Sequence, residues 1–151
     1  MKPRLYFDTS VFGGINDVEF QEDSIKLFEM VKNSEIICVF SDLTERELEN
    51  APEIVKNHFL SISIHHREMV SVTEDAYNLA ENYINEKVVG ETSFDDCVHI
   101  ATATIHKVDY LISWNFKHIV NVFRIKGYNA VNLKNGYIQL DIRSPKEIIR
   151  S

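Results

Sequence analysis

Short apolar segments alternate with longer amphipathic segments along the chain, and this alternation constrains the fold more than any other feature. Residues 5–7 (LYF), 36–40 (IICVF) and 109–113 (DYLIS) have the length and apolar character of short buried strands. Between them, apolar residues recur at helical spacing, most clearly at 21–33 and 94–108. Strands that alternate with helices predict an α/β fold with a mainly parallel sheet flanked by helices.

The remaining segments extend this pattern along the sequence. Before residue 90 we expect a helix at 41–51, a helix at 53–60, an extended stretch at 69–72 and a helix at 74–87. After residue 113 we expect a short helix around 117–126 that ends at Gly127, a strand at 129–133 and a helix from Pro145. No repeat, low-complexity tract or linker interrupts the pattern, so residues 1–151 are expected to form a single domain.

The composition is that of an ordinary globular protein, with 44% hydrophobic and 26% charged residues. No apolar run approaches the roughly 20 residues that span a bilayer, and the chain reaches Asp8 before it can form the apolar core of a signal peptide. Cys38 and Cys97 match no metal-ligand spacing and suit a reducing compartment. We therefore expect a cytoplasmic protein without membrane association.

The formal net charge of −7 is unusual for a nucleic-acid-binding protein, because phosphate binding normally requires a basic surface. This objection weakens if many of the acids surround a bound cation. A divalent metal reverses the local field and links protein carboxylates to phosphate. The net charge by itself therefore leaves a nucleic-acid partner open.

Polar residues follow three of the predicted strands. Asp8, Ser41 and Ser113–Asn115 each stand where an apolar run ends. In open α/β sheets, binding sites form beyond the carboxyl ends of the strands, so these positions predict a site. Asp8 also fits a helix N-cap or a turn, although Thr9 or Ser10 can serve that purpose equally well.

Two further acids lie on predicted helices. Thr44 and Glu47 have the spacing of a capping box, which is an alternative to a functional role for Glu47. Asp96 shares a helical stripe with Ile100 and Ala103 and is expected to point inward. Asp95 is expected to be a solvated first-turn acid, because its stripe contains the more polar residues His99, Thr102 and His106. We expect these two histidines in packing or at the surface, since metal-binding pairs usually lie four residues apart.

Convergence of Asp8, Glu47 and Asp96 would require a positive charge between them. Two carboxylates about 4 Å apart repel by roughly 4 kcal/mol at an effective dielectric constant of 20. Without a cation, one of them would take up a proton. Because only oxygen ligands are available, the pattern favours Mg²⁺ or Mn²⁺ over zinc.

Four blocks of the sequence resemble the PIN-domain family of nucleases, many of which are VapC-like toxins. They are YFDTSV at 6–11, SDLTEREL at 41–48, DCVHIATA at 96–103 and LISWNFKHI at 111–119. The resemblance implies a three-layer α/β/α sandwich in which Asp8, Glu47 and Asp96 bind Mg²⁺ or Mn²⁺. Many members have an aspartate where this chain has Asn115, whose amide oxygen can bind a metal or a metal-bound water without adding charge. The resemblance implies that Asn115 completes the catalytic set.

The same resemblance implies a function: hydrolysis of single-stranded RNA by metal-activated water. It also implies a homodimer, the toxin role of a type II toxin–antitoxin pair, and a cognate antitoxin partner. The helices at 21–33 and 53–60 are where we expect a dimer or antitoxin surface. The alternative is a catalytically impaired PIN-fold module that binds RNA or protein. A receiver-type signalling domain ranks last, because the run IICVF ends in Ser41 rather than in an aspartate.

Candidate substrate-binding residues lie beside the proposed ligands. Thr9 and Ser10 can hydrogen-bond a metal ligand or the scissile phosphate, or can simply cap a helix. Trp114 can stack on an RNA base, with core packing as the alternative. Lys117 is a candidate for contact with the RNA backbone, as are Arg124 and Lys126, although a solvated face explains all three equally well.

Overall fold

Five parallel strands form the centre of the computed structural model, which describes residues 2–149. They are β1 (Arg4–Phe7), β2 (Ile37–Ser41), β3 (Arg67–Val70), β4 (Tyr110–Ile112) and β5 (Ile142–Arg143). Their order in the sheet is β3-β2-β1-β4-β5, so the first strand lies in the middle. The chain builds outward from β1 first on one side and then on the other. Such a reversal of strand order leaves a crevice at the carboxyl end of the central strand, where ligands bind in α/β proteins.

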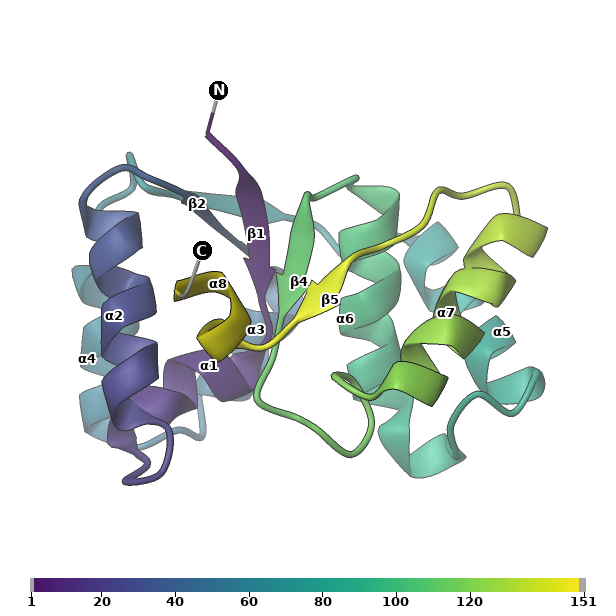
Figure 1. The fold of residues 1–151 in the computed structure, drawn as a ribbon, viewed down its shortest axis with the longest axis horizontal. Helices are drawn as coiled ribbons and strands as arrows, with labels where there is room; N and C mark the ends of the chain where they lie inside the picture. The colour runs from purple at the N-terminus through teal and green to yellow at the C-terminus, as the bar shows by residue number, and fades with distance from the viewer. Residues whose placement is uncertain (1, 150–151) are drawn as a thin grey trace.

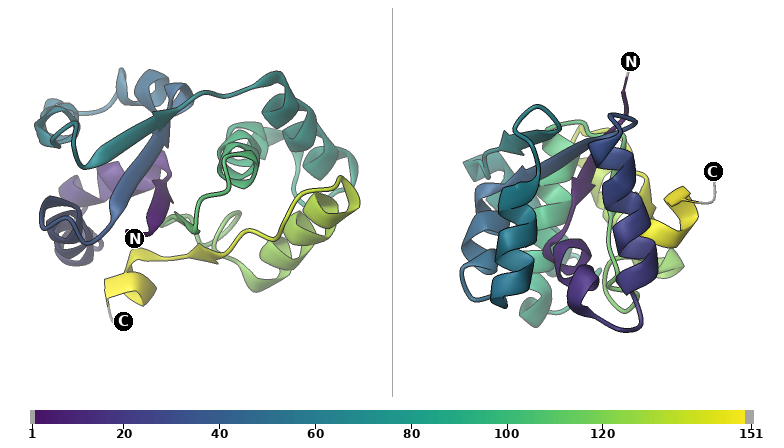
Figure 2. Two further views of the ribbon diagram at one scale, coloured as in Figure 1. Left: turned by 90° about the horizontal axis from the view of Figure 1, so that it is seen from above. Right: turned by 90° about the vertical axis from the view of Figure 1, so that its left-hand side faces the viewer.

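Helices cover both faces of the sheet (Figure 1). They are α1 (Thr9–Gly13), α2 (Gln21–Lys32), α3 (Asp42–Leu48), α4 (Glu53–Ser61), α5 (Glu74–Asn85), α6 (Phe94–Ile105), α7 (Val122–Lys134) and α8 (Pro145–Ile149). Helices α2 and α4 lie on one side and α5, α6 and α7 on the other, as the views in Figure 2 also show. This three-layer arrangement confirms the predicted α/β/α fold. No helix within residues 2–149 is long and apolar enough to cross a membrane.

The central strand supplies both cores because successive side chains of a strand point to opposite faces. Leu5 and Phe7 belong to the core beneath α2 and α4, where Phe7 packs edge-on against Phe28 with ring centroids 5.4 Å apart. Tyr6 points the other way, into the core formed with α5 and α6. These three side chains are almost fully buried, whereas Arg4 at the start of the strand is partly exposed. Burial of each large apolar side chain contributes about 1.5–3 kcal/mol, which makes this strand a rigid base for the residue that follows it.

The sequence between residues 117 and 134 folds differently from the prediction. The expected helix end at Gly127 and the expected strand at 129–133 are both wrong, because α7 continues through this glycine to Lys134. A Cβ atom at Gly127 would lie 2.8 Å from Cγ1 of Val88. The glycine therefore permits close packing of α7 and does not end the helix. The strand that completes the sheet is β5, further along the chain.

Candidate active site

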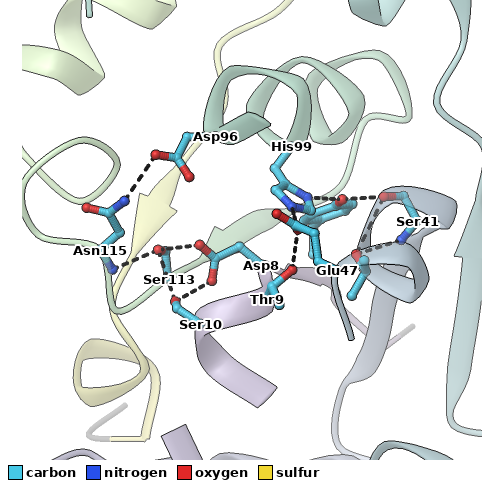
Figure 3. Close-up of polar contacts among 11 residues, drawn as sticks. Asp8, Thr9, Ser10, Ser41, Glu47, Asp96, His99, Ser113 and Asn115 are labelled. Carbon is cyan, nitrogen blue, oxygen red and sulfur yellow. Dashed lines mark hydrogen bonds and ion pairs between the residues drawn. The ribbon is translucent and has the colours of Figure 1, made fainter. Parts of the chain in front are cut away.

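The candidate site lies at the carboxyl ends of β1, β2 and β4. Asp8 directly follows β1, Ser41 ends β2 and Ser113 directly follows β4. Helix α3 brings Glu47 to this edge, and the first turn of α6 brings Asp96. Figure 3 shows the three carboxylates around one region, although they come from segments far apart in the sequence.

Asp8 is held by two hydroxyl groups. Ser10 Oγ donates to its Oδ1 atom at 2.5 Å, and Ser113 Oγ donates to its Oδ2 atom at 2.8 Å. The Asp8 side chain makes no capping hydrogen bond to α1, although the residue occupies the N-cap position. Burial raises the pKa of this carboxyl group, against the opposing effect of the two hydroxyls and of His99. The structure thus shows a buried, oriented acid in place of a helix cap.

Glu47 is also oriented by hydrogen bonds, and it does not close a capping box. Thr9 Oγ1 donates to Glu47 Oε1 at 2.5 Å, and His99 Nε2 lies 2.6 Å from the same oxygen. At the start of α3 it is Thr44 Oγ1 that accepts the bond from the backbone N–H of Ser41, at 3.2 Å. Burial alone would raise the pKa of Glu47, but the hydrogen bonds and charge of His99 lower it overall, with Thr9 contributing. Glu47 is therefore a stabilised carboxylate.

His99 is a site residue that the sequence did not predict, since its position indicated packing or the more polar side of its helix. It is almost fully buried, and its Nδ1 atom lies 2.6 Å from the Tyr6 hydroxyl while Nε2 faces Glu47. Because a carboxylate only accepts hydrogen bonds, Nε2 donates to Glu47, and Nδ1 forms the hydrogen bond with the Tyr6 hydroxyl. The spacing contained a signal: residues three apart on a helix are neighbours, which places His99 beside Asp96.

Asp96 differs from its neighbour Asp95 as predicted, because Asp95 is exposed and Asp96 is partly buried. Its carboxylate accepts a hydrogen bond of 3.2 Å from Asn115 Nδ2. Burial raises the pKa of Asp96 to about 6, with a further contribution from the charge of Asp8. Among the described residues, one side chain donates a hydrogen bond to Asp96, whereas two side chains donate to Asp8 and two to Glu47.

Asn115 presents its amide nitrogen to the site. Its Oδ1 atom accepts hydrogen bonds from the backbone N–H groups of Lys117 at 3.2 Å and His118 at 3.0 Å. The amide nitrogen is therefore the end that faces Asp96. In this arrangement the Asn115 amide nitrogen restrains Asp96, while its oxygen accepts hydrogen bonds from two backbone N–H groups.

The four candidate substrate-binding residues have different surroundings. Thr9 and Ser10 use their hydroxyls to orient Glu47 and Asp8. Trp114 is buried, its Nε1 donates to Ser24 Oγ at 2.8 Å, and its ring stacks on Phe20 with centroids 4.2 Å apart. This placement corresponds to the core-packing alternative, since a covered ring has no free face for a base. Lys117 is exposed.

The donor chemistry of the site suits a hard divalent cation, but the present side-chain positions do not form a ready-made site. Asp8 and Glu47 both raise the pKa of Asp96 through their charges, which shows that the three acids share one electrostatic field. A cation would relieve this repulsion. Within residues 2–149, however, no group of three or more His, Cys, Asp or Glu side chains is arranged so that it could hold a metal ion.

Solved structures with the same fold include VapC toxins and toxin–antitoxin complexes. VapC20 from Mycobacterium tuberculosis, described as a sarcin-ricin loop cleaving toxin, aligns with a TM-score of 0.58 and 12% identity over 90% of this chain and 98% of its own. VapBC2 from Rickettsia felis, bound to a DNA fragment from its promoter, aligns with a TM-score of 0.56 and 13% identity over 93% and 98%. A toxin–antitoxin complex from Klebsiella pneumoniae aligns with a TM-score of 0.54 and 16% identity, over 75% of this chain and 88% of its own.

These similarities establish a PIN-like fold. No family model matches the sequence, and no curated protein matches it either. The identities of 12–16% show common architecture and do not transfer an activity. The function must therefore be inferred from the residues of the site.

Proposed function

We propose that this protein is a ribonuclease that hydrolyses single-stranded RNA with Mg²⁺ or Mn²⁺ held by Asp8, Glu47 and Asp96. The observation that supports this most strongly is the meeting of three acids at the carboxyl end of the central strand, with the pKa of Asp96 raised to about 6 and that of Asp8 also raised. Buried carboxylates in one field are destabilising unless they are protonated or bind a cation. Such an arrangement is typical of a functional site.

The protein residues in this proposal have distinct tasks. Ser10 and Ser113 orient Asp8. Thr9 and His99 orient Glu47, and Asn115 restrains Asp96. A bound metal would lower the pKa of a coordinated water and stabilise charge on the phosphate oxygens. Fixing the carboxylates in advance reduces the reorganisation needed when metal and substrate bind.

The toxin role, the homodimer and the antitoxin partner belong to the same proposal. They rest on the fold shared with VapC toxins and toxin–antitoxin complexes. A cavity of about 730 Å³ between α2 and α4, lined by Ile25, Phe28 and Ile62 among others, is consistent with the partner surface expected on these helices.

The second candidate function is a PIN-fold module that binds RNA or protein without cleavage. Asn115 favours it, because the amide adds no charge and its oxygen is bonded to backbone N–H groups. Against it stand the hydrogen bonds that hold Asp8 and Glu47 in place, which a binding module would not require.

The deciding experiment compares cleavage of labelled single-stranded RNA in Mn²⁺, in Mg²⁺ and in EDTA. Asp96→Asn is the test variant and Asp95→Asn is its matched control, because the two acids are adjacent but only Asp96 faces the site. We expect cleavage that requires metal, persists in Asp95→Asn and disappears in Asp96→Asn. Binding without cleavage, unchanged by EDTA, would support the second candidate instead.

A further inference from the structure

One segment of this acidic protein contains no acids. All 23 Asp and Glu residues lie outside residues 110–140, although the chain has a net charge of −7. The segment carries cations only: Lys117, Arg124, Lys126 and Lys134. It comprises β4, the loop that follows it and α7. The charge of the protein is therefore unevenly distributed along the chain.

The first half of this segment adjoins the candidate site. Asn115, which bonds Asp96, accepts a hydrogen bond from the backbone N–H of His118. Burial lowers the pKa of His118, and the charges of Lys117 and Arg124 lower it further, so both cations lie within electrostatic range of this residue. Figure 1 shows the β4–α7 loop and the beginning of α7 at the same end of the sheet as α1.

The same region exposes apolar side chains that do not contribute to the core. Phe123 is 85% exposed, more than any other aromatic residue of the described chain, and Val122 before it is 78% exposed. Phe116 is 49% exposed, and its ring centroid lies 6.1 Å from that of Trp114 and 6.4 Å from that of Phe20. Phe116 is thus supported by two buried or partly buried rings while half of it remains open to solvent.

We propose that the loop–α7 surface binds single-stranded RNA and leads it to the acidic site. This surface is defined as Phe116, Lys117, Val122, Phe123 and Lys126, because the partly buried Arg124 donates a hydrogen bond to the Val88 carbonyl. Single-stranded nucleic acid is bound by aromatic faces that stack on bases together with cations that follow the phosphates. Both kinds of group are present here, and Phe116 and Lys117 directly follow Asn115, the residue that restrains Asp96. The identity of the ligand rests on the proposed ribonuclease function.

Charge distribution favours RNA as the occupant of the surface. The net charge of −7 and the three acids of the site repel a polyanion. The acid-free segment 110–140, which carries four cations and begins beside the site, provides an attraction for the phosphates. A protein partner held by Phe123 and Val122 alone would not require the cations, so it is the competing outcome of the test.

The test measures fluorescence anisotropy of a labelled single-stranded RNA in EDTA, where binding is separated from cleavage. Phe123→Ala and Lys117→Glu are the test variants. Leu60→Ala on α4 and Lys26→Glu on α2 are matched controls, because both side chains are exposed on other elements. We expect Phe123→Ala to weaken binding at least about fivefold, the effect of losing one stacked base. Lys117→Glu should weaken binding and reduce its salt dependence, while both controls stay within about twofold of the unchanged protein.

The outcomes separate this inference from the proposed function. If the unchanged protein binds no RNA, or if both test variants bind as tightly as it does, the surface is not an RNA site, even if cleavage is observed. If binding falls in the test variants but no metal supports cleavage, the surface stands and the ribonuclease proposal fails. Loss of binding to a protein partner with unchanged RNA binding would assign the surface to protein docking. Thermal melts verify that the exposed substitutions leave folding intact.

Discussion

The two sides of the candidate site differ in how firmly the protein holds their acids. On the His99 side, Glu47 Oε1 lies 2.5 Å from Thr9 Oγ1 and 2.6 Å from His99 Nε2, and Tyr6 contacts the other ring nitrogen. On the Asp96 side, Asn115 provides a hydrogen bond of 3.2 Å. The pKa of Glu47 is lowered, whereas that of Asp96 is raised to about 6. Hydrogen bonds from the protein thus stabilise the charged form of Glu47, whereas burial and neighbouring charges disfavour the charged form of Asp96.

The largest expected effect comes from removing the charge of Asp96. Asp96→Asn should reduce metal-dependent RNA cleavage by at least about 100-fold. This exceeds the loss of about 10- to 100-fold that is typical when a residue that only orients a metal ligand is replaced. The metal-free protein should become more stable by about 1 kcal/mol, after discounting for solvent screening, because a partly buried and repelled charge disappears. Initial cleavage rates and urea unfolding in EDTA measure the two effects. A variant that loses both activity and stability would mean that Asp96 is a structural residue.

Removing the hydrogen bond between His99 and Glu47 should reduce both stability and metal affinity. His99→Ala removes a buried ring and leaves Glu47 without its strongest partner, so unfolding free energy should fall by about 2–3 kcal/mol. Affinity for Mn²⁺ should fall about 10- to 100-fold, as for other residues that orient a metal ligand. Titration calorimetry and urea unfolding measure the two quantities.

Two further variants distinguish orientation of Glu47 from simple packing. His99→Gln retains a donor and should recover part of the Mn²⁺ affinity. His106→Ala removes the histidine at the C-cap of the same helix, whose side chain contacts the exposed Ser71 carbonyl, so the Mn²⁺ affinity of this variant should not change. Equal affinity in His99→Gln and His99→Ala would show that the ring acts only by filling space.

Adding a negative charge beside Asp96 should increase metal affinity and decrease the stability of the metal-free protein. In Asn115→Asp, one oxygen can still accept the backbone bonds while the other replaces the donor that faces Asp96. We expect Mn²⁺ affinity to rise about tenfold, since ligand charge tunes divalent affinity. Stability in EDTA should fall by about 1 kcal/mol because two carboxylates now face each other. Unchanged Mn²⁺ affinity would show that the side chain at position 115 does not contribute to metal binding.

The smallest expected effect is a pH dependence of the metal-free protein. The pKa of Asp96 is higher in the folded state, about 6, than its ordinary value of 3.8, so the folded state binds the proton more tightly. The contribution of this group to stability is therefore present below pH 4 and is lost as the pH rises through 6. The difference in unfolding free energy between the unchanged protein and Asp96→Asn, measured at pH 5 and pH 7.5, should be larger at pH 7.5. A difference independent of pH would contradict this assignment.

The strands of the sheet illustrate how far the sequence predicts the fold. The runs at 5–7, 36–40 and 109–113 are strands because each is apolar enough to be buried on both faces. The short edge strand β5 could not be predicted, since two residues contain no periodic pattern. Gly127 was misread because a glycine that ends a helix and one that allows close packing look the same in sequence.

The sequence by itself determined the first four strands, most of the helices between them and the three acids at or near their ends, because hydrophobic periodicity and strand-end position are local properties. Only the tertiary structure decided which partners those acids have. His99, Thr9 and Asn115 contact Glu47 or Asp96 across gaps of 52, 38 and 19 residues, distances along the chain over which no local pattern applies. Tertiary packing thus determines how deeply Asp96 and Glu47 are buried and which groups they contact. Because burial and contacts shift their pKa values in opposite directions, packing also decides which of them is the more stable carboxylate.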